Sequence, residues 1–291
     1  MVIHEDLTLS QASLQDYVDC HYRFRLRHLD RLEWPSVESE ADSGNENRRW
    51  EGAEFHRMVH QYLLGVPAEK LQKAAEYRSR LREGDNLVDW WHAFCKYRPA
   101  DGPGEAFPEV MLAAGVLGQR IAAKFDLVMI EESGRVVIFD WKTASRRPDT
   151  NIIERRLQTH IYPYLLSLSG SILNDGKPIY PEQIEMRYWF ASFPTQPEVI
   201  RYDDSRFTAD DELIGSLVRE ILERPINDFS RTEDLRHCGL CTYRSLCKRD
   251  EVGSQDDQDE DQAQIMPSQT WIEAGEDTIE FDYPSVEEMP F

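Results

Sequence analysis

The chain has 291 residues, of which 41% are hydrophobic and 11% aromatic, and this composition excludes a wholly disordered protein. It carries 33 Lys and Arg against 54 Asp and Glu, so its net charge of -21 disfavours a nucleic-acid partner on bulk electrostatics alone. However, residues 251–291 hold 13 acidic and no basic residues, which leaves only -8 on residues 1–250. The acidity is therefore partly a property of the C-terminal tail.

The sequence contains no run of about 18 uncharged apolar residues, and its N-terminus lacks the basic-then-apolar pattern of a secretion signal. We therefore expect a cytoplasmic protein with no membrane partner. Three of the five cysteines, Cys238, Cys241 and Cys247, lie within ten residues. In a reducing compartment, this spacing favours a metal centre over disulfide bonds.

Helical periodicity dominates the first hundred residues. Thr8 or Ser10 is placed to cap a first helix, which carries Leu14, Tyr17 and Cys20. A second helix is expected from about Trp50 to Leu64, with His56 on it. A third is expected from Ala68 to about Tyr97, ending before the Pro and Gly residues of 99–104.

Beyond this point the pattern changes to strands. Residues 109–143 read as β-structure, with a hairpin whose arms are Gln119–Glu131 and Arg135–Lys142. Gly134 suits the left-handed position that closes its three-residue loop. The remaining expected elements are a helix through Leu157, Ile161 and Leu165, a strand over Glu185–Phe193 and a helix over Asp210–Glu223.

The hairpin brings charged residues together. Its expected register places Asp126 opposite Asp140 and Lys124 opposite Lys142, where cross-strand Cβ atoms lie about 4.5–5.5 Å apart. Two opposed carboxylates repel each other unless a positive group lies between them, and a divalent cation is the obvious one. Lys142 points to the same side of the sheet as Asp140. Taken alone, Asp-x-Lys at a strand end is also common as an ordinary charged terminus.

Four motifs in order resemble the RecB-like nucleases of the PD-(D/E)XK superfamily. They are Gly52-x3-His56, Phe125-Asp126, Phe139-Asp140-Trp141-Lys142 and Gln158-x3-Tyr162. The resemblance covers roughly residues 8–249 and implies an α/β fold, with a mixed central sheet flanked by helices, of the restriction-endonuclease type. It also implies metal-dependent cleavage of DNA.

The resemblance assigns roles to these residues. It implies Mg²⁺ or Mn²⁺ held by His56, Asp126, Asp140 and the backbone carbonyl of Trp141. Lys142 would orient the attacking water and stabilise developing charge. Gln158 and Tyr162, one helical turn apart, would hold Lys142 or a phosphate, which completes the catalytic set of Asp126, Asp140, Lys142, Gln158 and Tyr162. The residues alone leave His56 open as a structural histidine and Gln158 and Tyr162 as polar residues at a helix edge.

The spacing Cys238-x2-Cys241-x5-Cys247 supplies three thiolates, and Cys20 or Cys95 must supply the fourth. Similarity to AddB and to the CRISPR-associated RecB-like exonucleases implies Cys20 and a 4Fe-4S cluster, although His21 stands where those proteins usually have proline. Cys95, within an aromatic helix, reads as a small buried apolar residue. Structural Zn²⁺ remains the alternative. Basic residues surround the ligands and offer contacts to phosphates: Arg231, Arg236, His237, Arg244, Lys248 and Arg249.

The tail, residues 250–291, is acidic but contains aromatic residues that a purely solubilising tail rarely needs. Its end, Val286-Glu-Glu-Met-Pro-Phe291, is similar to the C-terminal tip of bacterial single-stranded-DNA-binding proteins. This similarity implies that Met289, Pro290 and Phe291 bind a pocket on a DNA-repair protein. The alternative is an inert tail, or one that covers the DNA groove.

These observations predict a nuclease domain over residues 1–249, including the cysteine cluster, and a disordered tail over 250–291. The predicted function is a metal-dependent deoxyribonuclease, an exonuclease on single-stranded DNA or duplex ends, acting in repair or recombination. No Gly-x4-Gly-Lys-Ser/Thr phosphate loop is present, so a helicase would be a partner. The alternatives are a CRISPR-associated DNA-trimming nuclease, a non-catalytic DNA-binding module and a zinc-dependent adaptor.

Overall fold

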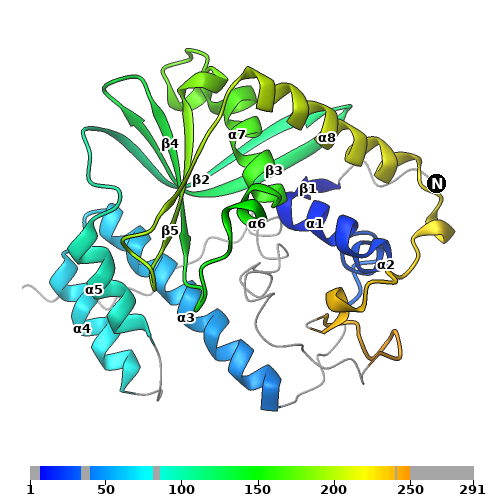
Figure 1. Cartoon of the computed structure of the whole chain (residues 1–291), viewed down its shortest axis with the longest axis horizontal. Coiled ribbons are helices and arrows are strands. Elements are labelled where there is room, and N and C mark those ends of the chain that lie inside the picture. The colour runs from blue at the N-terminus through cyan, green and yellow to red at the C-terminus, as the bar shows by residue number, and fades with distance from the viewer. Residues whose placement is uncertain (1–6, 34–39, 81–85, 240, 250–291) are drawn as a thin grey trace, which may run out of the picture.

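The computed structural model describes residues 7–33, 40–80, 86–239 and 241–249, with the backbone alone for 40–46. A central sheet is covered by helices on both faces (Figure 1). Its strands are β1 (Thr8–Ser10), β2 (Gly104–Val116), β3 (Gln119–Glu131), β4 (Val136–Lys142), β5 (Ile184–Phe190) and β6 (Glu198–Arg201). No helix in these ranges has the length and apolarity to cross a membrane.

The sheet is of mixed direction, as the resemblance implies. β1 is parallel to β3 and β4 is parallel to β5, whereas β2 and β4 are antiparallel to β3 and β6 is antiparallel to β5. The β2–β3 hairpin turns through Leu117 and Gly118, which both have positive φ, as a two-residue type I′ connection requires. The fold is therefore the α/β class predicted from the sequence.

The register predicted for the β3–β4 hairpin is confirmed over four pairs, from Ile130 opposite Val136 to Leu127 opposite Phe139. Regular pairing ends there, one step before Asp126 and Asp140 would face each other. Asp126 and Asp140 therefore lie just beyond the last regular pair of the ladder, and their side chains are available for other partners.

The end of this ladder lies at a fork in the sheet. β2 pairs with β3 along its whole length and occupies one edge of it, so β1 and β4 must share the other edge. β1 takes residues 120–122 of β3 and β4 takes residues 127–130. Asp126 lies between these two stretches, at the point where the strands separate.

The alternation of side chains between the two faces of the sheet is also interrupted at this row. Phe125 and Val128, three residues apart on β3, belong to the same core cluster. Regular pleating would place them on opposite faces. Phe107 and Val110 on β2 show the same shift. Between them lies Glu109, whose φ of 54° is left-handed, so both strands change face at the row of Glu109 and Asp126.

Two apolar cores fix the helices. On one face pack α1 (Gln11–Asp19), α7 (Leu157–Ser169) and α8 (Asp204–Glu223), and on the other α3 (Glu40–Leu63), α4 (Ala68–Ser79) and α5 (Leu87–Tyr97) (Figure 1). The short helices are α2 (His21–Phe24) and α6 (Thr150–Glu154), and a π-helical turn covers Arg25–Leu29. Residues 136 and 138 of β4 face the α7 side and residues 137, 139 and 141 face α3 and α5.

Two local predictions need revision. The expected third helix is two helices, α4 and α5, and Asn86, directly before Leu87, has a non-helical backbone. Cys20 is not on the first helix but in extended backbone between α1 and α2. The predicted cap of the first helix is confirmed, since Ser10 caps α1 through a reciprocal pair of hydrogen bonds with Ser13. The tail and its tip, Met289, Pro290 and Phe291, lie outside the described residues.

Candidate active site

Asp126 occupies the fork in the sheet and binds two elements. Its Oδ2 accepts a hydrogen bond from the backbone N–H of Trp141 at 2.9 Å, in place of a ladder partner. Its Oδ1 lies 3.2 Å from Nδ1 of His56 on α3. In an extended strand, the N–H and C=O of one residue point toward the same neighbouring strand. The carbonyl of Trp141 is therefore directed to the side on which Asp126 lies.

Glu109 joins this group, although none of the sequence motifs contains it. Ligand atoms of His56, Glu109 and Asp126 all lie within 4.8 Å of one another. Glu109 also forms an ion pair with Lys124 of β3. A left-handed backbone is costly for a glutamate, and such strain is typical of functional sites. The register of β2 and β3 from the Leu117–Gly118 turn places Glu109 opposite Asp126.

Asp140 and Lys142 face the α7 side of β4, and both are at least nine-tenths buried. Lys142 donates from Nζ to Oε1 of Gln158 at 3.0 Å, and Gln158 donates from Nε2 to Oδ1 of Asp140. The second carboxylate oxygen of Asp140 lies 3.0 Å from Nζ of Lys142. It accepts no hydrogen bond among the described residues. The Gln158 amide thus holds both the Lys142 amine and the Asp140 carboxylate in place.

Tyr162 lies one turn after Gln158 on α7 and is also buried. Its ring contacts Phe125, the neighbour of Asp126, with centroids 4.7 Å apart. Burial raises the pKa of Tyr162 well above its ordinary value of 10, and the nearby Asp140 and Asp126 raise it further. The phenol is therefore neutral at physiological pH and keeps its proton for donation.

The two aspartates have opposite electrostatics. Burial raises the pKa of Asp126, but the His56 imidazole and the Trp141 N–H outweigh burial and hold that pKa below 3.8. Burial raises the pKa of Asp140 above 3.8, against the effect of Lys142. Burial lowers the pKa of His56, but Asp126 outweighs it and raises the pKa above 6.5. The Asp126 carboxylate is thus stabilised by its neighbours, whereas burial disfavours the charged form of Asp140.

Gly52, the first residue of the His56 motif, explains how α3 approaches this site. A Cβ at this position would lie 3.0 Å from Oγ1 of Thr143, the residue that follows Lys142. The missing side chain lets α3 pack closely against the end of β4. His56, one turn further on, then reaches Asp126. The Gly-x3-His spacing is thus a packing requirement as well as a motif.

The structure brings together every residue predicted for this site: His56, Asp126, Asp140, Trp141, Lys142, Gln158 and Tyr162. They come from α3, β3, β4 and α7, and Glu109 adds β2. Three carboxylates, one imidazole and one directed carbonyl match the hard oxygen and nitrogen ligands that Mg²⁺ and Mn²⁺ accept. A buried lysine beside them is suited to stabilise a developing negative charge.

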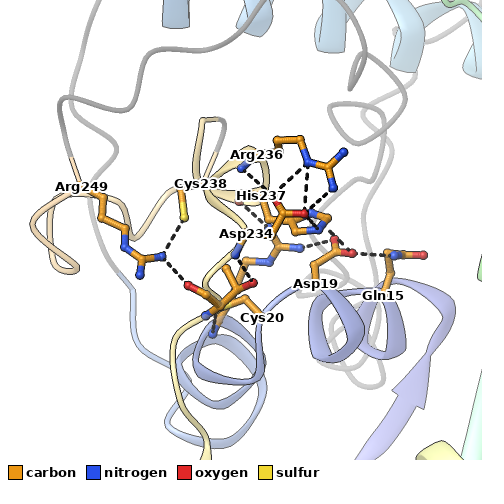
Figure 2. Close-up of polar contacts among 10 residues, drawn as sticks. Gln15, Asp19, Cys20, Asp234, Arg236, His237, Cys238 and Arg249 are labelled. Atoms are coloured by element: carbon orange, nitrogen blue, oxygen red, sulfur yellow. Dashed lines mark hydrogen bonds and ion pairs between the residues drawn. The ribbon is translucent and has the colours of Figure 1, made fainter.

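The four predicted cysteine ligands also converge. Cys20, Cys238, Cys241 and Cys247 line one pocket between α2 and the C-terminal residues 231–249. Backbone N–H groups of Arg23 and Thr232 each donate to Sγ of Cys20 at 3.4 Å. Figure 2 shows Cys20 and Cys238 on segments that are more than 200 residues apart in sequence. Cys95 does not line this pocket and instead packs against the core of α3 and α5.

Several basic residues around the cysteines make contacts within the protein. Arg231 donates to the carbonyl of Cys247, Arg244 to the carbonyl of Gly239, and Arg236 pairs with Asp234. His237 lies 3.7 Å from Asp19 (Figure 2). These contacts hold the side chains beside the cysteine segment, and their contact with phosphates stays a prediction.

Comparisons with known proteins agree with this arrangement. The profile of the PD-(D/E)XK nuclease superfamily matches residues 8–248. A crystal structure named "Putative exonuclease", from Eubacterium rectale, aligns with a TM-score of 0.50 and 13% identity, over 89% of this chain and 94% of that one. The crystal structure of SSO0001 aligns with a TM-score of 0.40 and 14% identity, over 84% and 87%. No curated protein sequence matches the chain.

The family profile spans nearly all of the described residues. Nucleases of this family hydrolyse phosphodiester bonds with divalent metal ions. The chain belongs to the PD-(D/E)XK nuclease superfamily.

Proposed function

We propose that the protein is a RecB-like, Mg²⁺- or Mn²⁺-dependent exonuclease that acts on single-stranded DNA or on duplex ends. The main support for this proposal is that Asp126, Asp140 and Lys142 meet at one fork in the sheet. Hydrogen bonds join Asp126 to Trp141, and Gln158 to both Lys142 and Asp140. A binding module without catalysis would have no need of a buried lysine held between an amide and a carboxylate.

The residues present fit a divalent cation. Oδ2 of Asp140 is buried beside the Lys142 amine, 3.0 Å away, and a second lone pair on this oxygen could bind an ion. We assign His56, Asp126 and Glu109 as ligands, because their ligand atoms lie within 4.8 Å of one another. We assign Asp140, which lies outside that group, and the Trp141 carbonyl as further ligands. A bound cation would supply Lewis acidity and a more acidic water.

The chain's own groups would do the rest of the chemistry. Lys142 is positioned to orient the attacking water and to stabilise the charge that develops on the phosphate oxygens. Gln158 holds the lysine amine and restricts it to the side of Asp140. Tyr162 keeps its proton and offers a hydrogen-bond donor to a phosphate oxygen or to Gln158. Water attacks phosphorus and the P–O bond to the leaving strand breaks.

For the cysteine site we propose a 4Fe-4S cluster rather than Zn²⁺. A tetrahedral zinc with Zn–S distances of about 2.3 Å holds its sulfurs about 3.8 Å apart. Among the described residues, the three-ligand groups within 4.8 Å comprise His56, Glu109 and Asp126 and no set of cysteines. Four cysteines line one pocket, one from the N-terminal segment and three from the C-terminal segment, and this is the ligand set that the resemblance implies for a 4Fe-4S cluster. The cluster would join the N-terminal and C-terminal ends of the domain.

The biological context follows from chemistry and from the tail. We propose a cytoplasmic role in DNA repair or recombination, with a helicase or another repair protein as the partner. The tail tip, Met289, Pro290 and Phe291, would bind a pocket that recognises the tips of single-stranded-DNA-binding proteins. The CRISPR-associated alternative shares the same site and differs in its biological partners.

The test uses anaerobically purified full chain with Mn²⁺ and three substrates: linear single strands labelled at the 5′ end or the 3′ end, and a circular single strand of the same length. An exonuclease releases short labelled products from one end first and leaves the circle intact. Rapid cleavage of the circle would show an endonuclease. No cleavage of any substrate by cluster-loaded protein would contradict the proposal.

A further inference from the structure

Arg249 makes a contact that distinguishes it from the other basic residues of the cysteine segment. Its Nη1 lies 3.1 Å from Sγ of Cys238 and donates to the carbonyl of Thr232 at 2.8 Å (Figure 2). A guanidinium beside sulfur offers both a positive charge and an N–H···S hydrogen bond. Cys238 is the most buried of the four cysteines, at 7% exposure.

Thr232 extends this contact to the N-terminal ligand. Its backbone N–H donates to Sγ of Cys20 at 3.4 Å, and its carbonyl accepts from Arg249. Cys20, Thr232, Arg249 and Cys238 therefore form one hydrogen-bonded unit. The unit spans the two parts of the chain that the proposed cluster would join.

Two other arginines of this pocket, Arg23 and Arg231, also lie near the cysteines, but they have further partners. Arg23 is buried and bound by two carboxylates, Asp16 at 2.8 Å and Asp19 at 2.6 Å. Arg231 donates to the carbonyl of Cys247 and lies over the Tyr22 ring. The hydrogen bond with Cys238 raises the pKa of Arg249, and the nearby Cys247 and Cys20 raise it further. The Arg249 charge is thus directed at the sulfur ligands.

Four thiolates around a 4Fe-4S core leave net negative charge in a partly buried pocket, and this charge grows when the cluster is reduced. Hydrogen bonds to the sulfurs and nearby charge are two of the factors that set the reduction potential of such a cluster. A positive donor stabilises the reduced state more than the oxidised state. It also disfavours the oxidation that begins cluster loss in air.

We propose that Arg249 is a positioning residue for the cysteine-bound cluster, which raises the cluster's reduction potential and slows its loss in oxygen. This inference rests on the proposed 4Fe-4S assignment. It predicts that Arg249→Gln, which removes the charge, lowers the reduction potential and shortens the lifetime of the cluster's visible absorbance in air severalfold. Arg249→Lys keeps the charge and is expected to recover part of both properties.

The experiment compares full-length, anaerobically purified wild type with Arg249→Gln, Arg249→Lys and a matched control, Arg236→Gln. Arg236 lies on the same segment, but its side chain is 75% exposed and paired with Asp234. The readouts are iron and sulfide content, the potential from a dithionite titration followed by visible absorbance and electron paramagnetic resonance, and the rate of bleaching in air.

Support for the inference is a lower potential in Arg249→Gln, partial recovery in Arg249→Lys and no change in Arg236→Gln. If Arg249→Gln does not retain its cluster during purification, the variant is reconstituted anaerobically with iron and sulfide before the titration, and a wild-type potential then overturns the inference. Equal potentials and bleaching rates in wild type and cluster-loaded Arg249→Gln also overturn it. Zinc without iron in the wild type would instead refute the cluster assignment, and the inference with it.

Discussion

Gly52→Ala tests whether the packing of α3 against β4 positions the catalytic residues. In a helix interior, replacing glycine with alanine normally stabilises a protein by about 1 kcal/mol. At Gly52 the new Cβ lies 3.0 Å from Oγ1 of Thr143, closer than ordinary van der Waals contact. Thr143 is buried and follows Lys142 directly, so its side chain, the strand end or the helix must give way by a few tenths of an ångström.

The magnitude follows from two opposing effects. Overpacking in a tight interior costs about 1–3 kcal/mol, which cancels or exceeds the gain in helix propensity. We expect Gly52→Ala to lower the stability by about 1 kcal/mol, or about 2–4 °C in melting temperature for a domain of this size. A displacement of about 1 Å at a catalytic group costs about 100-fold, so about 0.3 Å corresponds to roughly a fourfold loss of cleavage rate.

Gly215 on α8 supplies the matched control, because a Cβ there meets no atom within 4 Å. Gly215→Ala should gain most of the roughly 1 kcal/mol and leave cleavage unchanged. The assays are thermal unfolding without metal and the initial rate on labelled single-stranded DNA with Mn²⁺. Equal stabilisation of both variants, together with wild-type cleavage by Gly52→Ala, would refute the packing argument.

Two further predictions concern metal binding and acid stability. Glu109→Gln removes one of three converging ligand groups, so Mn²⁺ affinity in isothermal titration should fall about tenfold or more, and an unchanged affinity would remove Glu109 from the site. Burial raises the pKa of Asp16, but its hydrogen bond to His28 and the charges of Arg23 and Arg27 outweigh burial and hold the pKa below 3.8. Its stabilising contribution is therefore complete above pH 3.8 and declines as the pH falls through the folded-state pKa. Urea midpoints between pH 5 and pH 3 should fall less steeply for Asp16→Asn than for wild type, and parallel slopes would contradict this assignment.

Local sequence rules predicted the parts of the site that depend on neighbours in the chain. The three-residue loop 132–134 predicts the observed register of β3 and β4, and this register predicts that Asp126 lies near Asp140. Helical spacing placed Gln158 and Tyr162 on one face of α7, where Gln158 binds Lys142. Cysteine spacing indicated a shared site, and the four predicted sulfurs line one pocket.

The missing parts depend on contacts that periodicity does not encode. Glu109 enters the site because its left-handed backbone changes the face of β2, an irregularity that alternating patterns cannot predict. Cys20 leaves the first helix because its side chain accepts the N–H of Arg23 and so begins the next helix. Between α4 and α5 the sequence contains the turn-forming residues Gly84-Asp85-Asn86, a signal that the helical periodicity on both sides outweighed.

The most direct test of the account compares wild type with Lys142→Met in two measurements on the same cluster-loaded preparations. Lys142 lies 3.0 Å from Asp140, but it is assigned to the chemistry and not to metal binding. We expect Lys142→Met to bind Mn²⁺ at least as tightly as wild type and to cleave single-stranded DNA at least about 100-fold more slowly. Cleavage by Lys142→Met at the wild-type rate would contradict the assignment of this fork in the sheet as the catalytic centre.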